Sequence, residues 1–323
     1  MYIVTGGAGF IGSAMIWKLN CMGIDDILVV DNLGTSEKWK NLVNRRYSAY
    51  MHRDAFIERV RNRSLTDKVE AVIHMGACSS TTERDADFLM RNNLEYTKAL
   101  CLFALENGAR FINASSAATY GDGSRGFDDD PDAIDALRPL NMYGYSKQLF
   151  DLWAKRHDLL DSLASLKFFN VYGPNEQHKG DMRSVVNKAF HLISEEGVMR
   201  LFRSDHPDFP DGGQMRDFVY IKDCVDIMWW LLQNSQVNDI FNVGTGKARS
   251  WNDLATAVFS SMDLPANIAY IDMPLQLKGK YQNFTEARMD CLRAVGYTVP
   301  MCSLEEGVAD YVNNYLQQPD PYL

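Results

Sequence analysis

Short apolar runs alternate with longer amphipathic stretches through the first half of the chain. In chain order, the expected elements are a strand at Tyr2–Thr5, a helix at about Phe10–Met22, strands at Ile27–Val30 and Ala71–His74, a helix at about Thr82–Asn107 and a strand at Phe111–Ala114. This alternation is typical of the α/β class, with a doubly wound parallel sheet of the Rossmann type. Since ligands of such sheets bind beyond the carboxyl ends of the strands, we expect the functional residues there.

The second half of the chain has longer loops that are rich in Pro, Gly and Asp. We expect residues 1–170 to form a dinucleotide-binding domain and residues 171–323 to form mainly a smaller C-terminal substrate-binding lobe. A helix expected at Val219–Leu232 and a strand expected at Asp239–Val243 return to the first domain, so that the two parts interleave near 217–246. The acidic run 128–132 is expected to be a solvated loop.

The composition and net charge of the chain argue against some classes of binding partner. The 323 residues are 46% hydrophobic and 23% charged, which suits a globular core, and the net charge is −9. Such a chain is a poor partner for nucleic acid or for an anionic membrane surface, because both require a basic face. The six cysteines lack zinc spacing, so we expect no metal, and reduced thiols in a cytoplasm. The immediate first strand and the lack of a long apolar run predict a soluble protein that is not exported.

A glycine-rich turn follows the first predicted strand. Gly6, Gly9 and Gly12 stand three residues apart and open the first predicted helix. Small residues let backbone N–H groups and the positive helix N-terminus approach a pyrophosphate. The pattern predicts that the chain binds a dinucleotide.

The residue that ends the second predicted strand bears on which dinucleotide is bound. Asp31 could accept a hydrogen bond from the adenosine ribose 2′-hydroxyl, which favours NAD. Lys38 and Arg53 are within loop reach and could instead bind a 2′-phosphate through charge-assisted hydrogen bonds, with Asn32 as a further donor. Asn92, in the long helix, could place an amide near the cofactor. The residues by themselves leave NAD and NADP open.

A tyrosine and a lysine one helical turn apart predict hydride transfer. Lys147 follows Tyr143 by four residues, so that on a helix the ammonium can lower the pKa of the phenol and make it a base near neutrality. Ser116, just past a predicted strand, could hold the oxygen that is oxidised. Lys147 could also bind the nicotinamide ribose.

These features resemble those of the extended short-chain dehydrogenase/reductases, the superfamily of nucleotide-sugar epimerases, dehydratases and reductases. Besides the glycine turn, the resemblance rests on Ser115–Gly121, Tyr143–Lys147, Phe169–Pro174, Arg216–Tyr220 and Phe241–Gly246, and it spans nearly the whole chain. It implies that Asn170 and Arg216 contact a nucleotide sugar. The cofactor contacts expected in total are Gly6, Gly9, Phe10, Ile11, Gly12, Asp31, Asn32, Lys38, Arg53, Met75, Gly76, Ala77, Cys78, Ser79, Asn92, Tyr143, Lys147, Val171 and Lys179.

Narrower features resemble one branch of that superfamily, which epimerises ADP-linked heptoses. They are Gly76–Glu83, Ala114–Gly121, Asn141–Lys147, His178–Gly180 and Leu277–Gln282. The resemblance implies NADP, with Lys38 and Arg53 at its 2′-phosphate, and it implies that Lys179 is a second catalytic base. It also implies inversion of C6 of an ADP-heptose through a keto sugar for lipopolysaccharide inner-core assembly, by a homo-oligomer such as a pentamer.

The expected substrate contacts include positions that depart from that branch. Asp181 stands where the branch has a Ser, Lys188 stands near the position of a His, and Phe202, Arg203, Ser204 and Asp205 replace a Phe-Glu-Gly-Ser stretch. With Ser116, Asn170, Arg216 and Tyr281, they complete the expected substrate site. Tyr281 could pack near the adenosine diphosphate.

Two other functions stay open. A 4-epimerase of UDP-hexoses would let one tyrosine serve both faces of the sugar. A catalytic role of Lys179 would therefore distinguish the heptose epimerase from the 4-epimerase. A 4,6-dehydratase is disfavoured because Ala117 and Ala118 occupy the places of its carboxyl groups. A redox-sensing protein that binds NADP without turnover should have lost Tyr143 or Lys147, and this chain has both.

Overall fold

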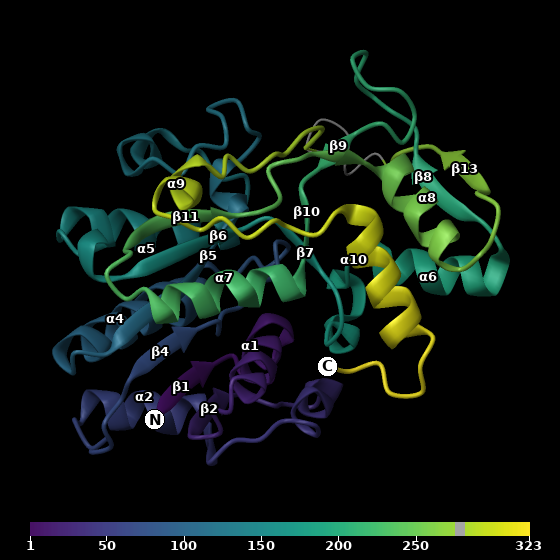
Figure 1. The fold of residues 1–323 in the computed structure, drawn as a ribbon. Coiled ribbons are helices and arrows are strands. Elements are labelled where there is room, and N and C mark those ends of the chain that lie inside the picture. Colours follow the sequence, from purple (N-terminus) through teal and green to yellow (C-terminus); the bar gives the residue numbers. More distant parts are fainter. Residues whose placement is uncertain (275–281) are drawn as a thin grey trace.

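The computed structural model describes residues 1–274 and 282–323, and a seven-stranded parallel sheet lies at the centre of this part (Figure 1). Its strands are β1 (Tyr2–Thr5), β2 (Ile27–Asp31), β3 (Ala49–His52), β4 (Ala71–His74), β5 (Arg110–Ser116), β6 (Ala164–Phe168) and β11 (Asp239–Val243). The strand order is β11-β6-β5-β4-β1-β2-β3, and the direction of winding reverses between β1 and β4. The predicted doubly wound α/β fold is therefore confirmed.

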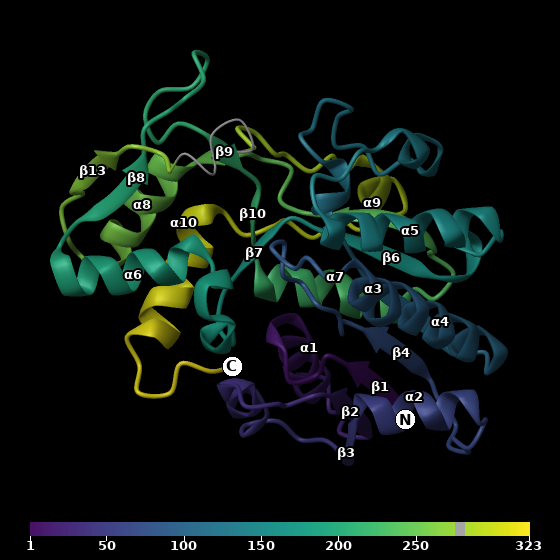
Figure 2. The same ribbon diagram turned by 180° about the vertical axis from the view of Figure 1, so that it is seen from behind.

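Helices cover both faces of the sheet. On one face lie α1 (Phe10–Cys21) and α7 (Ile221–Gln233), and on the other lie α2 (Arg53–Arg61), α4 (Tyr96–Glu106) and α5 (Met142–Arg156), as Figures 1 and 2 show from opposite sides. Because neighbouring side chains of a strand point to opposite faces, Val4 packs into the core beneath α1, whereas Ile3 packs into the core beneath α2. Burial on both faces explains why these strands are continuous apolar runs.

A smaller lobe stands beyond the carboxyl ends of β5 and β6. Its helices α6 (Val185–Glu196), α8 (Trp251–Ser261) and α10 (Leu304–Tyr311) pack with the strand pair of β8 (Met199–Phe202) and β13 (Ile268–Ile271) (Figure 1). The remaining elements are the pair β7 (Asn170–Tyr172) and β10 (Phe218–Tyr220), the pair β9 (Met215–Arg216) and β12 (Arg249–Ser250), and the short helices α3 (Ala86–Leu89) and α9 (Asp290–Ala294). The chain thus crosses between sheet and lobe more than once.

Two expected helices begin later than the sequence pattern suggested. The helix expected from Thr82 begins after Asp85, whose carboxylate caps the N–H of Phe88, and it passes through a π-helical stretch, Met90–Glu95, before α4. The helix expected from Val219 begins at Ile221, because Phe218–Tyr220 pairs with β7. Local apolar pattern does not separate the end of a buried strand from the start of a buried helix.

The prediction of a solvated acidic run was wrong for one residue. The side chain of Asp129 is only 1% exposed, and its Oδ2 accepts a hydrogen bond from the backbone N–H of Asn242 at 2.6 Å. Asn242 belongs to β11, an edge strand of the sheet, whose outward N–H has no neighbouring strand. Asp129 therefore supplies the acceptor that a missing strand would have provided.

No helix within 1–274 and 282–323 is long and apolar enough to cross a membrane.

Asp217 ties together three segments that are far apart in the sequence. It is fully buried between β9 and β10, and its carboxylate accepts hydrogen bonds from the N–H and hydroxyl of Thr245, from the N–H of Gly246 and from the N–H of Ala287. The three backbone N–H groups would lose their acceptor if the carboxylate were removed, whereas the Thr245 hydroxyl also contacts the backbone of Lys247. Burial without a partner is the costly outcome for such groups.

We therefore expect Asp217→Ala to lower the free energy of unfolding by about 2–4 kcal/mol, measured by urea denaturation. The matched control is Asp67→Ala at an exposed position, which should change it by less than about 0.5 kcal/mol. If both substitutions lowered the free energy of unfolding equally, the structural role assigned to the Asp217 carboxylate would be contradicted.

Candidate functional site

The turn between β1 and α1 leaves backbone N–H groups open for an anion. Gly6 has a φ of +64°, and a Cβ added to Gly12 would lie 2.1 Å from the carbonyl oxygen of Gly6. Gly9 caps α1 without a side-chain hydrogen bond, and no acidic residue lies in the first helical turn. The N-terminus of α1 is therefore positive and unshielded, which fits a dinucleotide pyrophosphate.

Asp31, at the end of β2, is neutralised by the residues around it. One carboxylate oxygen accepts the N–H of Ala8 at 2.8 Å, and the other accepts the N–H of Asn32 at 2.6 Å and the ammonium of Lys38 at 2.7 Å. Arg53 lies at the start of α2 and donates to the side-chain oxygen of Asn92. Two cations thus stand beside a carboxylate whose charge one of them already balances.

These residues line one cavity of about 510 Å³ along the carboxyl ends of the strands. Of the expected cofactor contacts, the cavity is lined by Gly6, Gly9, Phe10, Ile11, Gly12, Asp31, Asn32, Lys38, Arg53, Met75, Gly76, Ala77, Ser79, Asn92, Tyr143, Lys147, Val171 and Lys179. Cys78 is not among the lining residues. Its backbone N–H and C=O are both held by the amide of Asn93, at 2.9 Å each, so Cys78 belongs to the frame of the cavity.

The start of α5 brings Tyr143 to Ser116. Asn141 caps the helix through the N–H of Gly144, and a Cβ at Gly144 would lie 2.6 Å from the carbonyl oxygen of Ala118. This close approach presses α5 against the 3₁₀ turn that follows Ser116. Tyr143 and Ser116 consequently line the same cavity, and the ammonium of Lys147, one turn further along α5, donates to the carbonyl oxygen of Ala114 at 2.6 Å.

Burial dominates the acid–base properties of this group. It raises the pKa of Tyr143, which the hydrogen bond from Ser116 lowers only in part, and it lowers the pKa of Lys147 to about 8. The expectation that Lys147 brings the phenol near neutrality is not met by the protein atoms themselves. The physical reason is that burial outweighs the other influences on the phenol, while the Lys147 ammonium donates to the carbonyl oxygen of Ala114.

A second cavity, of about 1210 Å³, adjoins the first at this point. Ser116, Tyr143, Lys179 and Val171 line both cavities. The Lys179 ammonium lies 5.0 Å from the centre of the Phe10 ring, and burial and the neighbouring Lys188 lower its pKa while Glu176 raises it. Two groups that can exchange protons therefore border the same junction.

The expected substrate contacts divide into two sets. Asn170 and Arg216 line the second cavity with Ser116, and the Arg216 guanidinium also lies 5.7 Å from the ring of Trp251. The described lining of both cavities leaves out Asp181, Lys188, Phe202, Arg203, Ser204 and Asp205. Arg203 instead pairs with Asp272 across the lobe. Tyr281 lies outside the described residues.

Sequence reasoning missed His178 and Trp251, which line the first and the second cavity respectively. His178 contacts the side-chain nitrogen of Asn41 at 3.2 Å, and burial, with the nearby cations Lys179 and Lys38, lowers its pKa to about 4. It is therefore a neutral imidazole beside the cofactor cavity. Its only sequence signal was its position next to Lys179.

This fold and this site place the chain in a known class. The chain belongs to the NAD dependent epimerase/dehydratase family, whose model matches residues 2–244. Membership in this family agrees with the glycine-rich turn before α1 and with the cluster of Ser116, Tyr143 and Lys147. It supports a nicotinamide cofactor.

Individual relatives are more specific. The chain is 70% identical, over the full length of both proteins, to an ADP-L-glycero-D-manno-heptose-6-epimerase of Nitratidesulfovibrio vulgaris strain DP4. The crystal structure of the ADP-L-glycero-D-manno-heptose-6-epimerase of Helicobacter pylori matches with a TM-score of 0.80 and 26% identity, covering 97% of this chain and 95% of that one. A UDP-glucose 4-epimerase of Thermus thermophilus in complex with NAD matches with a TM-score of 0.72 and 25% identity, covering 95% and 96%.

We expect Gly12→Ala to abolish retention of the nicotinamide cofactor, because its methyl group would force the carbonyl of Gly6 and the turn apart. Cofactor content is measured by absorbance after heat extraction of the purified protein. Gly108→Ala is the control, since nothing lies within 4 Å of its added Cβ, and its positive φ should cost only about 1 kcal/mol of stability. Full cofactor occupancy in Gly12→Ala would contradict the assignment of the turn.

Proposed function

We propose that this protein is an isomerase that converts ADP-D-glycero-β-D-manno-heptose to ADP-L-glycero-β-D-manno-heptose. It inverts C6 by oxidation and re-reduction through a 6-keto sugar, with NADP. The observation that carries the proposal is that Tyr143 and Lys179 border the junction of the two cavities together with Ser116. The names of the relative with 70% identity and of the Helicobacter pylori structure support the substrate.

The residues of the first cavity would hold a nicotinamide dinucleotide, which would supply reversible hydride acceptance at the sugar carbon. Ser116 holds the reacting oxygen by its hydroxyl, and Tyr143 takes or returns the proton of one epimer. Inversion delivers hydride to the opposite face of the ketone, so the oxygen of the other epimer meets a different group. Lys179 holds that proton, because its partly depressed pKa lets the amine and the ammonium interchange.

In this proposal the two parts of the chain divide the work. Residues 1–170, with the returning segments near 217–246, hold the dinucleotide, and residues 171–323 form mainly the lobe that holds the sugar nucleotide. Arg216 is placed to bind a pyrophosphate and Asn170 to bind the sugar or nucleotide, since both line the second cavity.

The charges around the end of β2 favour NADP over NAD. The Asp31 carboxylate already accepts three hydrogen bonds, one of them from Lys38, so its charge is balanced. A 2′-phosphate would meet little repulsion from Asp31, and Lys38 and Arg53 can donate to it. A free Asp31 carboxylate would have favoured the 2′-hydroxyl of NAD.

A UDP-hexose 4-epimerase is the second candidate, because the Thermus thermophilus UDP-glucose 4-epimerase matches in fold over nearly the whole chain. One base suffices for that reaction if the ketone turns between the two hydride transfers. Lys179 at the junction favours the two-base scheme. An NADP-binding sensor without turnover is the remaining alternative, and tight cofactor binding with no epimerase activity would identify it.

The wider setting follows from the same substrate. The product would feed lipopolysaccharide inner-core assembly in the cytoplasm, and the enzyme would act as a homo-oligomer. These statements rest on the resemblance to heptose epimerases and not on a contact within the chain.

We expect the purified protein to epimerise ADP-D-glycero-β-D-manno-heptose, followed by proton NMR of the sugar, and to leave UDP-glucose unchanged. Tyr143→Phe and Lys179→Met should each reduce turnover by a factor of about 10² to 10⁴ with cofactor still bound, because each removes one proton-exchanging group. Lys68→Met, at an exposed lysine paired with Glu70, is the control and should leave turnover unchanged. Near-normal turnover in Lys179→Met would end the two-base scheme.

We expect the cofactor extracted from the protein to be NADP. In the Lys38→Ala/Arg53→Ala double variant, affinity for NADP should fall by about 10²-fold while affinity for NAD changes little, since only the 2′-phosphate loses charge-assisted hydrogen bonds. The control is Arg46→Ala, whose exposed guanidinium pairs with Asp25. Equal losses for NAD and NADP, measured by fluorescence titration of the reduced cofactors, would refute the assignment.

A further inference from the structure

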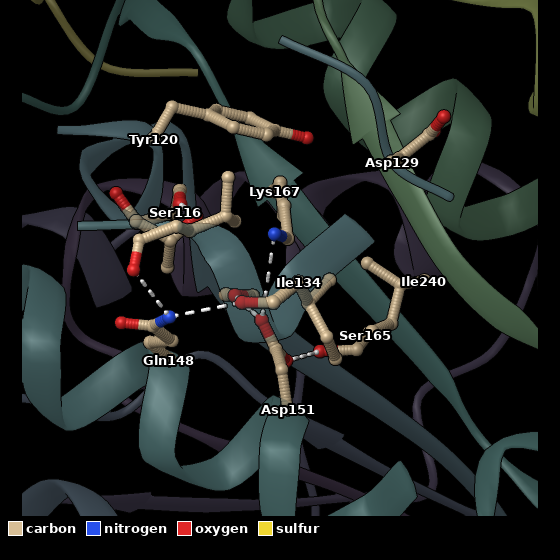
Figure 3. A network of polar contacts seen from close by, with 12 residues as sticks. Ser116, Tyr120, Asp129, Ile134, Gln148, Asp151, Ser165, Lys167 and Ile240 are labelled. Atoms are coloured by element: carbon tan, nitrogen blue, oxygen red, sulfur yellow. Dashed lines mark hydrogen bonds and ion pairs between the residues drawn. The ribbon is translucent and has the colours of Figure 1, made fainter. Parts of the chain in front are cut away.

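A buried pair of opposite charges lies directly beneath the cluster of Ser116, Tyr143 and Lys147. Asp151 comes from α5 and Lys167 comes from β6, and both side chains are about 1% exposed. The Lys167 ammonium lies 4.0 Å from Oδ2 of Asp151 (Figure 3). None of the chemistry assigned above uses either residue.

Two hydroxyls fix the position of Asp151. Oδ2 accepts a hydrogen bond from the hydroxyl of Ser115 at 2.6 Å. Oδ1 accepts one from the hydroxyl of Ser165 at 2.7 Å (Figure 3). Ser165 is itself held by the amide of Asn113 at 3.0 Å. Because these partners lie on β5 and β6, the carboxylate is fastened to the sheet and not merely to its own helix.

The side chain of Lys167 is held by charge contacts. Its ammonium lies 4.5 Å from the centre of the Tyr120 ring and near Asp151, and among the described residues its Nζ has no hydrogen-bond partner. Asp129, which lies in the segment between β5 and α5, adds a second and smaller attraction to this ammonium. Such a buried cation persists only beside a compensating anion. Lys167 and Asp151 are therefore a matched pair.

Asp151 also faces the redox cluster. It follows Lys147 by four residues on α5, so the two side chains lie on one face of the helix. Lys147 reaches the carbonyl of Ala114, and the Asp151 carboxylate reaches the hydroxyl of Ser115, the next residue of β5. The other titratable groups against Lys147 are Tyr143 on α5 and His74 on β4. His74 is buried between Thr5 and Thr97, and burial holds its pKa at about 3, so it is neutral.

We propose that Asp151 is a positioning residue for the redox centre: its carboxylate, anchored to β5 and β6 and paired from below with Lys167, is the fixed counter-charge that keeps Lys147 in its ammonium form. This inference rests on the proposed function, together with the role that the sequence predicts for Lys147, whose cation serves Tyr143 and the nicotinamide ribose. Asp151 acts through Lys147 and does not itself touch the substrate.

The direction of the pKa shifts agrees with this geometry. Burial lowers the pKa of Lys147 to about 8, and Asp151 is the group that opposes the decrease. Burial raises the pKa of Asp151, and Lys167 is the largest influence that lowers it again, followed by Ser115, Ser165 and Lys147. Lys167 thus favours the ionised form of Asp151, and Asp151 favours the protonated form of Lys147.

The first test is the pH profile of kcat/KM for Asp151→Asn. Without the carboxylate, Lys147 loses its proton at lower pH, so the upper limb of the profile should move down by about one pH unit, which is about a tenfold loss of activity above it. Asp151→Glu keeps the charge and should leave the limb near the parent's position. The matched control is Asp310→Asn, which breaks the ion pair of Asp310 with Lys222 outside both cavities. An upper limb that stays in place in Asp151→Asn would overturn the proposal.

The second test needs no substrate, so that it separates this inference from the proposed function. A double-mutant cycle of Asp151→Asn and Lys147→Met, measured by urea unfolding, should show a coupling of about tenfold in the unfolding equilibrium constant at pH 6.5 that vanishes at pH 9.5. Coupling without any heptose turnover would uphold the inference and refute the function. Coupling that is absent, or equal at both pH values, would overturn the inference whatever the activity.

Asp151→Asn leaves Lys167 charged without its counter-charge, which can prevent folding. Both tests are therefore also made on Asp151→Asn/Lys167→Met, in which two uncharged side chains replace the pair, and the results are compared with those of the unsubstituted protein. Asp151→Asn/Lys167→Met should regain thermal stability relative to Asp151→Asn and still show the lowered upper limb. If the upper limb of the pH profile returned to its original pH together with the thermal stability, the role of Asp151 would be purely structural and the proposal would be overturned.

Discussion

All strands of the central sheet run in one direction, so their carboxyl ends meet at one edge, and most of the cofactor-binding and redox residues depend on that constraint. The turn after β1 offers backbone N–H groups, the end of β2 offers Asp31, and the end of β5 offers Ser116. The winding reverses between β1 and β4, which opens a crevice there and makes room for a dinucleotide. Residues that are far apart in the sequence become neighbours because the parallel topology brings the carboxyl ends of their strands to the same edge of the sheet.

Burial is the main electrostatic influence along this edge. It raises the pKa of Tyr143 and lowers that of Lys147, so it disfavours the charged form of each. A hydride-transferring centre needs those charged forms, and it also needs water excluded. The chain resolves this conflict with fixed partners that are themselves buried: the hydroxyl of Ser116 for the phenol, and the carboxylate of Asp151 for the ammonium. The protein therefore carries more charge in its interior than stability alone would favour.

The sequence predicted what depends on local pattern. Five of the seven strands of the central sheet follow from apolar runs, whereas β3 and β6 were not predicted. The glycine turn and the Tyr143/Lys147 spacing follow from the geometry of one turn or one helix. It could not predict what depends on a distant partner. Asp129 is buried because the edge strand β11 brings the N–H of Asn242 to it from 113 positions away. Likewise, nothing near Lys167 in the sequence reveals that α5 places a carboxylate beside it.

Lys179 differs from the rest of the centre because a loop, and not the sheet, carries it. Two asparagines fasten that loop to the cofactor-binding turn. The amide of Asn41 donates to the carbonyl of Ala8 at 2.9 Å and to that of Asn175 at 3.1 Å, and the amide of Asn175 donates to the hydroxyl of Ser13 at 2.9 Å. These hydrogen bonds thus hold the loop in a fixed position relative to the turn that would bind the pyrophosphate. A base on the second face of a sugar can be useful only if its distance from the nicotinamide is fixed, and these hydrogen bonds fix it through the turn rather than through the sheet.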